Sequence, residues 1–321
     1  ITAGDIDRDG DLYVFIGQNK IGYQTGEIPS PYYDANDSFP SYLLANDGNG
    51  SFTDVTAISG LGKKRNRRNF AASFVDVDRD GYLDLLLTND FCGNDLYLND
   101  GTGAFVDVSD ALVPRSISHG MSHTFGDYDL DGTLDFITIG MSSTTARRLD
   151  KLQLGRPDLP EHNRQRKHMG YGNRLYLNQD NQFHQASFNA DVARTGWSWG
   201  STTLDFDRDG DPDIYIVNGQ TSGKTTQDYC TQYWCHDLYH SSKGMTPAIK
   251  DYFGKIGFLF NGNHMSWNGY EHNALLMNVE GQGFVNVGFL MNCASEFDSR
   301  FAASADMDLD GRMDIIFEHT S

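Results

Sequence analysis

Residues 76–87 read Asp76-Val77-Asp78-Arg79-Asp80-Gly81-Tyr82-Leu83-Asp84-Leu85-Leu86-Leu87, an acidic loop that runs directly into an apolar segment. The loop follows the pattern D-x-D-x-D-G-x-x-D. Glycine at the sixth position permits a sharp turn that a Cβ would oppose, and the alternate carboxylates of a tightly curled loop can converge on one centre. Calcium takes about six to eight oxygen ligands. The pattern therefore predicts a calcium site.

The same loop recurs along the chain, and this repetition makes a chance match improbable. Four copies are complete, and an earlier fifth copy carries Tyr13 where the last aspartate would stand, with Asp11 as a partial substitute. Carboxylates this close together repel one another unless a cation lies between them. We therefore expect up to five calcium ions. Their predicted ligands are Asp5, Asp7, Asp9 and Asp11; Asp76, Asp78, Asp80 and Asp84; Asp127, Asp129, Asp131 and Asp135; Asp205, Asp207, Asp209 and Asp213; and Asp306, Asp308, Asp310 and Asp314.

Two other interpretations of the loop are weaker. A single Asp-Gly pair would indicate only a hairpin turn, but the pattern recurs. An EF-hand needs a glutamate at the twelfth loop position and a helix on each side. Here the loops are followed by short apolar segments of strand character: residues 85–87, 134–137, 214–217 and 315–317.

A second motif lies between the acidic loops, and residues 94–108 are its clearest copy. It predicts a strand, an Asn/Asp/Gly hairpin and another strand. Together with the acidic loop it makes a unit of four antiparallel strands, which is one blade of a β-propeller. The sequence predicts an all-β fold with blades near residues 1–58, 69–109, 120–188 and 197–288, and a partial blade at 300–321.

These motifs resemble the FG-GAP (VCBS-type) repeats of the integrin α-subunit propeller, and the chain is similar to secreted proteins of the cartilage acidic protein kind. Propellers of that family usually have seven blades, so the resemblance implies that these residues are part of a larger propeller. The open ends of such an arc could self-assemble. Extracellular calcium modules commonly work at roughly 10⁻⁴–10⁻³ M calcium. We therefore expect a secreted, extracellular or cell-surface location, with the periplasm as an alternative.

The formal net charge of −19 excludes some classes of partner. An acidic surface repels nucleic acid and anionic lipid. No apolar run approaches the roughly 18 residues that a bilayer crossing needs. We expect neither nucleic-acid binding nor membrane insertion.

Three long insertions, at residues 18–40, 141–172 and 219–272, connect the second and third strands of their blades. They should project from the face opposite the calcium loops, where a protein or carbohydrate ligand would bind. A basic segment with Arg164, Arg166 and His168 could hold an anionic group. Tyr233 and Trp234 could form a carbohydrate platform, or they could belong to a small core stapled by a Cys230–Cys235 disulfide, which we favour.

Histidines near these insertions suggest a transition-metal site as a further hypothesis. His119 and His123 precede an acidic loop, and His236 and His240 have i,i+4 spacing. The sequence shows no H-E-x-x-H motif. We therefore rank the functions as extracellular recognition or adhesion module, then structural subunit of a layer or filament, then metal-dependent enzyme.

Overall fold

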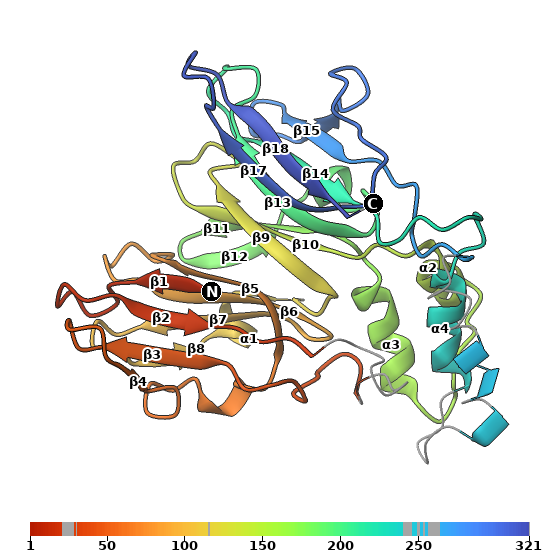
Figure 1. The fold of residues 1–321 in the computed structure, drawn as a ribbon, viewed down its shortest axis with the longest axis horizontal. Coiled ribbons are helices and arrows are strands. Elements are labelled where there is room, and N and C mark those ends of the chain that lie inside the picture. The colour runs from red at the N-terminus through yellow and green to blue at the C-terminus, as the bar shows by residue number, and fades with distance from the viewer. Residues whose placement is uncertain are drawn as a thin grey trace.

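Five antiparallel sheets follow one another along the chain (Figure 1). The computed structural model describes residues 1–20, 29, 31–114, 116–239, 246–248, 251–252, 254–255 and 264–320, without the side chains of residues 235–239. In each sheet the strands lie in the order of the sequence. The fold is an all-β propeller of four-stranded antiparallel blades, and the predicted fold class is confirmed.

The strands of the sheets have the following bounds. The first sheet contains β1 (Thr2–Gly4), β2 (Tyr13–Ile16), β3 (Tyr42–Asn46) and β4 (Phe52–Asp54). The second contains β5 (Arg68–Val75), β6 (Asp84–Asp90), β7 (Gly93–Asn99) and β8 (Phe105–Asp107). The third contains β9 (Gly120–Gly126), β10 (Asp135–Gly140), β11 (Arg174–Gln179) and β12 (Gln182–Gln185). The fourth contains β13 (Ser198–Leu204), β14 (Asp213–Asn218), β15 (Ala274–Asn278) and β16 (Phe284–Asn286), and the fifth contains β17 (Ser299–Ala305) and β18 (Asp314–His319).

The sheets fan out around a common line formed by their first strands. Strand β1 contacts β5, β5 contacts β9, β9 contacts β13, and β13 contacts β17. Figure 1 shows the succession from the N-terminal sheet, in red and orange, through β9 and β10 to the C-terminal strands, in blue. This radial order of blades places every acidic loop at one end of the fan, because each loop joins the first and second strands of its sheet.

A separate hydrophobic core fills each space between neighbouring sheets. In β6, Leu85 and Leu87 pack toward the first sheet, whereas Leu86 packs against Phe136 in the third. In β14, Ile214 likewise faces the third sheet and Tyr215 the fifth. Successive side chains of a strand point to opposite faces, so the continuous apolar segments after the acidic loops correspond to strands that are buried on both sides.

The insertions contribute most of the helical structure. Helices α2 (Thr144–Lys151) and α3 (Pro160–Met169) lie between β10 and β11, and α4 (Cys230–Tyr239) lies between β14 and β15; the shorter helices are α1 (Ser109–Leu112), η1 (Gly62–Lys64) and η2 (Asn189–Asp191). Helix α2 contacts both α3 and α4, and Figure 1 shows the three helices together on one side of the fan. None of the described helices has the length and hydropathy that a bilayer crossing requires.

Candidate metal centres

All five acidic loops share one internal hydrogen bond. The backbone N–H of the sixth-position glycine donates to the first aspartate in every copy: Gly10 to Asp5 at 3.1 Å, Gly81 to Asp76 at 2.9 Å, Gly132 to Asp127 at 2.9 Å, Gly210 to Asp205 at 3.2 Å and Gly311 to Asp306 at 2.9 Å. The glycines have φ between +82° and +100°, a region that a Cβ disfavours. The glycine of the motif therefore allows the positive φ that the turn requires, and its N–H holds the first aspartate in place.

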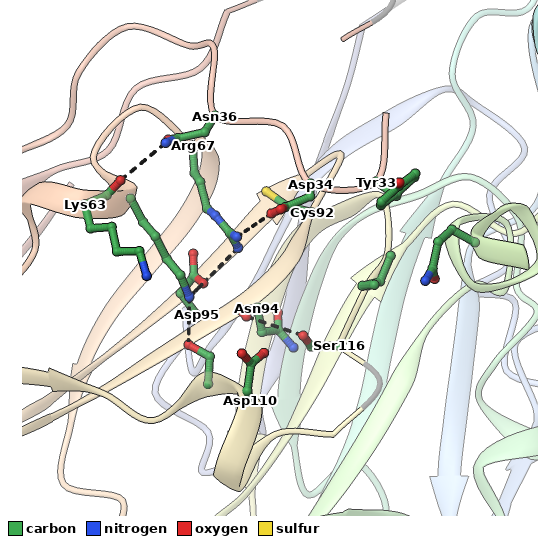
Figure 2. A pocket seen from close by; sticks show the side chains of 14 residues that line it. Tyr33, Asp34, Asn36, Lys63, Arg67, Cys92, Asn94, Asp95, Asp110 and Ser116 are labelled. Atoms are coloured by element: carbon green, nitrogen blue, oxygen red, sulfur yellow. Dashed lines mark hydrogen bonds and ion pairs between the residues drawn. The ribbon is translucent and has the colours of Figure 1, made fainter. Parts of the chain in front are cut away.

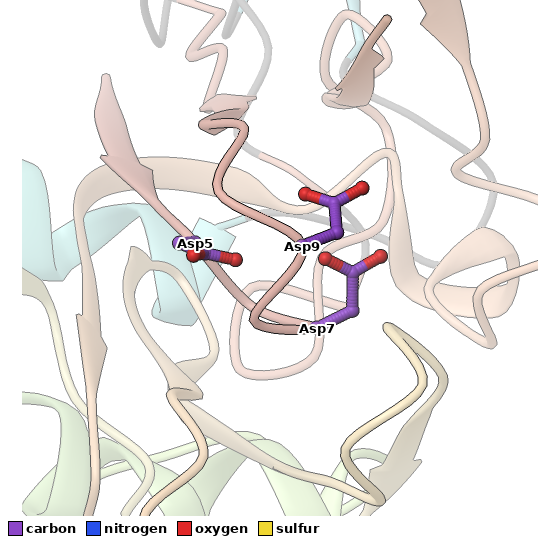
Figure 3. A group of neighbouring side chains, drawn as sticks. All are labelled: Asp5, Asp7 and Asp9. Carbon is purple, nitrogen blue, oxygen red and sulfur yellow. The ribbon is translucent and has the colours of Figure 1, made fainter. Parts of the chain in front are cut away.

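The first four loops each bring three of their aspartates together, whereas the predicted ligands Asp11, Asp80 and Asp131 are not in these groups. In each of the following groups the candidate ligand atoms lie within 4.8 Å of one another: Asp5, Asp7 and Asp9; Asp76, Asp78 and Asp84; Asp127, Asp129 and Asp135; Asp205, Asp207 and Asp213; and Asp207, Asp209 and Asp211. Figure 3 shows the three carboxylates of the first loop. Asp211 is a member that the sequence motif missed, because it stands at a position that the motif leaves free.

Orphaned oxygens indicate that these groups fit a cation. Oδ1 of Asp5, Asp7, Asp76 and Asp129 is buried and has no hydrogen-bond partner among the described residues. Burying a carboxylate oxygen without a partner is costly, and a hard divalent cation prefers oxygen ligands. The donor sets therefore fit such an ion, which would supply positive charge among the converging carboxylates.

The ninth-position aspartate tethers its loop to the strands around it. Asp84 is fully buried, and its oxygens accept hydrogen bonds from the backbone N–H of Val77 at 2.9 Å and of Asn99 at 2.9 Å. Asp135 is held in the same way by Tyr128 and Asn178, each at 2.8 Å. Burial raises the pKa of both carboxyl groups to about 7. Each of these aspartates is thus a tether of its loop as well as a candidate ligand.

The first loop differs at its ninth position. The Tyr13 hydroxyl donates to Asp7 Oδ2 at 3.0 Å. Burial, together with this hydrogen bond and the neighbouring carboxylates, raises the pKa of Tyr13 to about 12. A neutral donor therefore replaces a carboxylate here. Asp11 lies against Gly48 of the β3–β4 hairpin, and its N–H donates to Asp9 at 2.9 Å.

A cavity of about 460 Å³ opens at the opposite end of the second blade (Figure 2). Asp95 lies in its wall and pairs with Lys64 at 2.7 Å and with Arg67 at 2.9 Å, while Arg67 also reaches Asp34 at 2.6 Å. Asp110, Lys63 and Tyr33 contribute further to the lining. The sequence analysis missed these residues because they come from distant segments and carry no motif.

Four β-bulges at this same end are a second feature that the sequence analysis missed. The register shifts place one extra residue on the first strand of four sheets: Phe70, Met121, Trp199 and Arg300. A bulge redirects the side chain of the extra residue. The Phe70 and Trp199 rings lie 6.0 Å apart, and the Arg300 guanidinium lies 4.6 Å from the Trp199 ring centre. Aromatic and cationic side chains of the bulges thus connect β5, β13 and β17 at this end of the fan.

The predicted ligand-face residues are scattered in the structure. Tyr233 and Trp234 are buried in the core of the insertions, so they do not form an exposed platform. Arg166 is buried, and its Nη2 donates to the Leu154 carbonyl at 2.6 Å. Arg164 is exposed and pairs with Glu161, and His168 is partly exposed on the same helix. The side chain of His236 and all of His240 lie outside the described residues.

His119 and His123 have separate partners. His119 Nδ1 lies 2.7 Å from Asp90 Oδ1, whereas the His123 nitrogens contact Thr88 at 2.9 Å and Ser73 at 2.7 Å. Burial lowers the pKa of His123 to about 4. These two imidazoles connect neighbouring strands and do not converge on one point.

The predicted Cys230–Cys235 disulfide is wrong. Cys230 is a buried free thiol, and its Sγ lies 3.3 Å from Ser143 Oγ. Both cysteines are on α4. Five residues of helix rise about 7.5 Å, which is beyond the Cα separation of roughly 4.4–6.8 Å that a disulfide spans.

Comparison with known proteins supports the interpretation of the repeats. Residues 5–87 and 76–138 match the family model of the FG-GAP-like repeat, so this region consists of FG-GAP-like repeats. No curated protein matches the chain. Among solved structures, the chain is similar to a lectin from Agrocybe aegerita, described as recognising non-reducing terminal N-acetylglucosamine. The identity is 14%, the TM-score is 0.32, and the match covers 68% of this chain and 60% of the lectin, so the chain spans less than two thirds of that protein.

Proposed function

We propose that this chain is an extracellular recognition module in which calcium holds the acidic loops at one end of the blades and a ligand binds at the other. FG-GAP repeats are typical of extracellular proteins, and buried carboxylate oxygens without donors favour a bound cation. Calcium suits the all-oxygen donor sets better than a transition metal would. Calcium in the millimolar range, as outside cells, would fill such sites.

The cavity beside Asp95 is the observation that carries the recognition function. Its lining has three basic residues, Lys63, Lys64 and Arg67, which balance the three acidic residues Asp34, Asp95 and Asp110. Arg67 Nε is buried and has no hydrogen-bond partner among the described residues. A polar, charge-balanced cavity suits a ligand rich in hydroxyl groups, because a hydroxyl both donates and accepts hydrogen bonds. The Tyr33 ring in the wall adds an apolar surface for a sugar ring. A glycan is therefore our first choice of ligand, and an exposed protein loop is the second.

A binding screen tests this proposal. The purified chain, in millimolar calcium, is applied to an array of neutral and anionic oligosaccharides, and any glycan that binds is measured by calorimetry. We expect Asp110→Asn and Lys63→Met each to weaken binding about tenfold or more, since a hydrogen bond to a charged group contributes roughly 1.5–3 kcal/mol. Asp180→Asn, which removes an exposed charge from a distant hairpin, is the control. Glycan binding that both cavity variants leave unchanged would contradict the proposal.

A further inference from the structure

An asparagine at or next to the end of the third strand of a blade links that blade to the acidic loop of the preceding one. The side-chain amide of Asn99 donates to the Ile6 carbonyl at 2.6 Å, that of Asn178 to Val77 at 3.0 Å, and that of Asn278 to Tyr128 at 3.1 Å. Ile6, Val77 and Tyr128 all occupy the second position of their loops. The contact is therefore repeated at three successive blade junctions.

The backbone N–H groups of the same asparagines also donate to the ninth-position aspartate in the acidic loop of their own blade. The backbone N–H of Asn178 donates to Asp135 Oδ1 at 2.8 Å, and that of Asn278 donates to Asp213 Oδ1 at 2.8 Å. Asn99 makes the equivalent bond to Asp84 at 2.9 Å. One buried residue thus contacts two acidic loops in adjacent blades, one through its backbone and one through its side chain.

Arginines at the fourth loop position add a second contact at two of these junctions. Arg8 Nη2 donates to the carbonyl of Gly81, and Arg79 Nη2 donates to the carbonyl of Gly132. Each arginine thereby reaches the sixth-position glycine of the next loop. The third loop has Leu130 at this position, which has no donor to offer. The junction between the third and fourth loops therefore keeps the asparagine contact and lacks the arginine.

We propose that these asparagines and arginines are positioning residues that couple cation binding in neighbouring loops. The inference rests on the proposed calcium sites. A bound ion orders its loop and fixes the carbonyl groups that the next blade's side chains contact. Ordering one loop lowers the conformational entropy that its neighbour loses on binding, which produces positive cooperativity. Among the first four loops the coupling is weakest between the third and fourth, where Leu130 interrupts the series of arginines.

Calcium titration of the whole chain by calorimetry tests this coupling, with calcium alone as the probe. Arg79→Leu reproduces the natural interruption between the second and third loops, and Leu130→Arg restores the missing contact between the third and fourth. We expect Arg79→Leu to weaken calcium binding about fivefold at the affected loops and to lower the Hill coefficient, and Leu130→Arg to change both in the opposite direction. A factor of about five is at the lower end of the usual range of allosteric coupling. The number of ions bound stays the same in both variants.

Arg148→Leu, an exposed arginine removed from α2, is the matched control for the loss of charge. Asn178→Ala is the second test of the coupling, with folding checked by circular dichroism, and it should act like Arg79→Leu. If the calcium sites bind independently, and the Arg79, Leu130 and Asn178 variants leave their affinities unchanged, the proposed coupling is wrong. The calcium sites themselves would remain supported. A wild-type chain that binds no calcium would overturn the coupling together with the proposed function.

Discussion

Replacing Asp76 by asparagine should change the stability of the protein in opposite directions with and without calcium. Asp76 Oδ2 accepts a hydrogen bond from Gly81, and an asparagine can keep this bond, whereas the buried Oδ1 has no donor. The substitution therefore removes one charge while preserving shape. Its effect depends on whether that charge faces a cation or only the other carboxylates.

The distance between the carboxylates sets the size of the effect without calcium. Ligand atoms of Asp76, Asp78 and Asp84 lie within 4.8 Å of one another. At an effective dielectric constant of about 20, two charges at this distance repel by roughly 3 kcal/mol, and partial exposure to solvent reduces this to about 1 kcal/mol. In chelator we expect Asp76→Asn to be more stable than the wild type by about 1 kcal/mol.

In saturating calcium the order reverses, because the variant has lost a ligand. A 10- to 100-fold weaker site corresponds to about 1.4–2.7 kcal/mol of lost stabilisation. Thermal unfolding by calorimetry, in chelator and in 5–10 mM calcium (about the concentration that fills weak extracellular sites), measures both differences. Asp150→Asn, which neutralises an exposed carboxylate on α2, is the control and should leave the unfolding temperature unchanged in both buffers. A variant less stable than the wild type in both buffers, by the same amount, would refute the reasoning.

Three other substitutions test the core, the charge network and the insertion. Leu86→Ala empties a fully buried site between the second and third blades and should lower the free energy of unfolding by about 2–5 kcal/mol in chemical denaturation. Asp95→Asn leaves Lys64 and Arg67 without their shared buried partner and should lower it by roughly 3 kcal/mol; a loss below about 0.5 kcal/mol would show that the other partners suffice. Burial raises the pKa of Glu271 from 4.5 to about 7, so the fold favours its protonated form, and that stabilisation is complete below pH 4.5 and is lost as the pH rises through 7. Glu271→Gln should therefore gain up to about 3 kcal/mol relative to the wild type between pH 4.5 and 8, and a difference that is constant over this range would contradict the assignment.

The acidic loops and the strands after them could be predicted from the sequence because their signals are local. A glycine with positive φ, alternating carboxylates and a short apolar strand all lie within one stretch such as residues 76–87. The same holds for the Asn/Gly hairpins, whose turn type depends on a few neighbouring residues.

The contacts between blades could not be predicted in this way, because they join residues far apart in the chain. Asn278 and Tyr128, for example, are 150 positions apart. Their pairing depends on which blades are neighbours, which only the assembled fold determines. A repeated asparagine at or next to the end of each third strand was the available signal. The cavity beside Asp95 had no such signal, since its residues come from five separate segments of the chain.

The Cys230–Cys235 prediction failed for a geometric reason. Proximity in sequence favours pairing in a loop, but the segment forms helix α4, where five residues of helical rise separate the two backbone positions by more than a disulfide spans. Tyr233 and Trp234 lie on the same helix, and their side chains are buried in the core of the insertions.

The most direct test of the account is a count of calcium ions bound by the folded chain at millimolar calcium, made by native mass spectrometry and repeated after chelation. We expect four or five ions, one for each acidic loop, and a marked fall in unfolding temperature when they are removed. A folded chain that carries no calcium at this concentration, with the same unfolding temperature in chelator, would contradict the claim that cations stabilise the acidic ends of the blades.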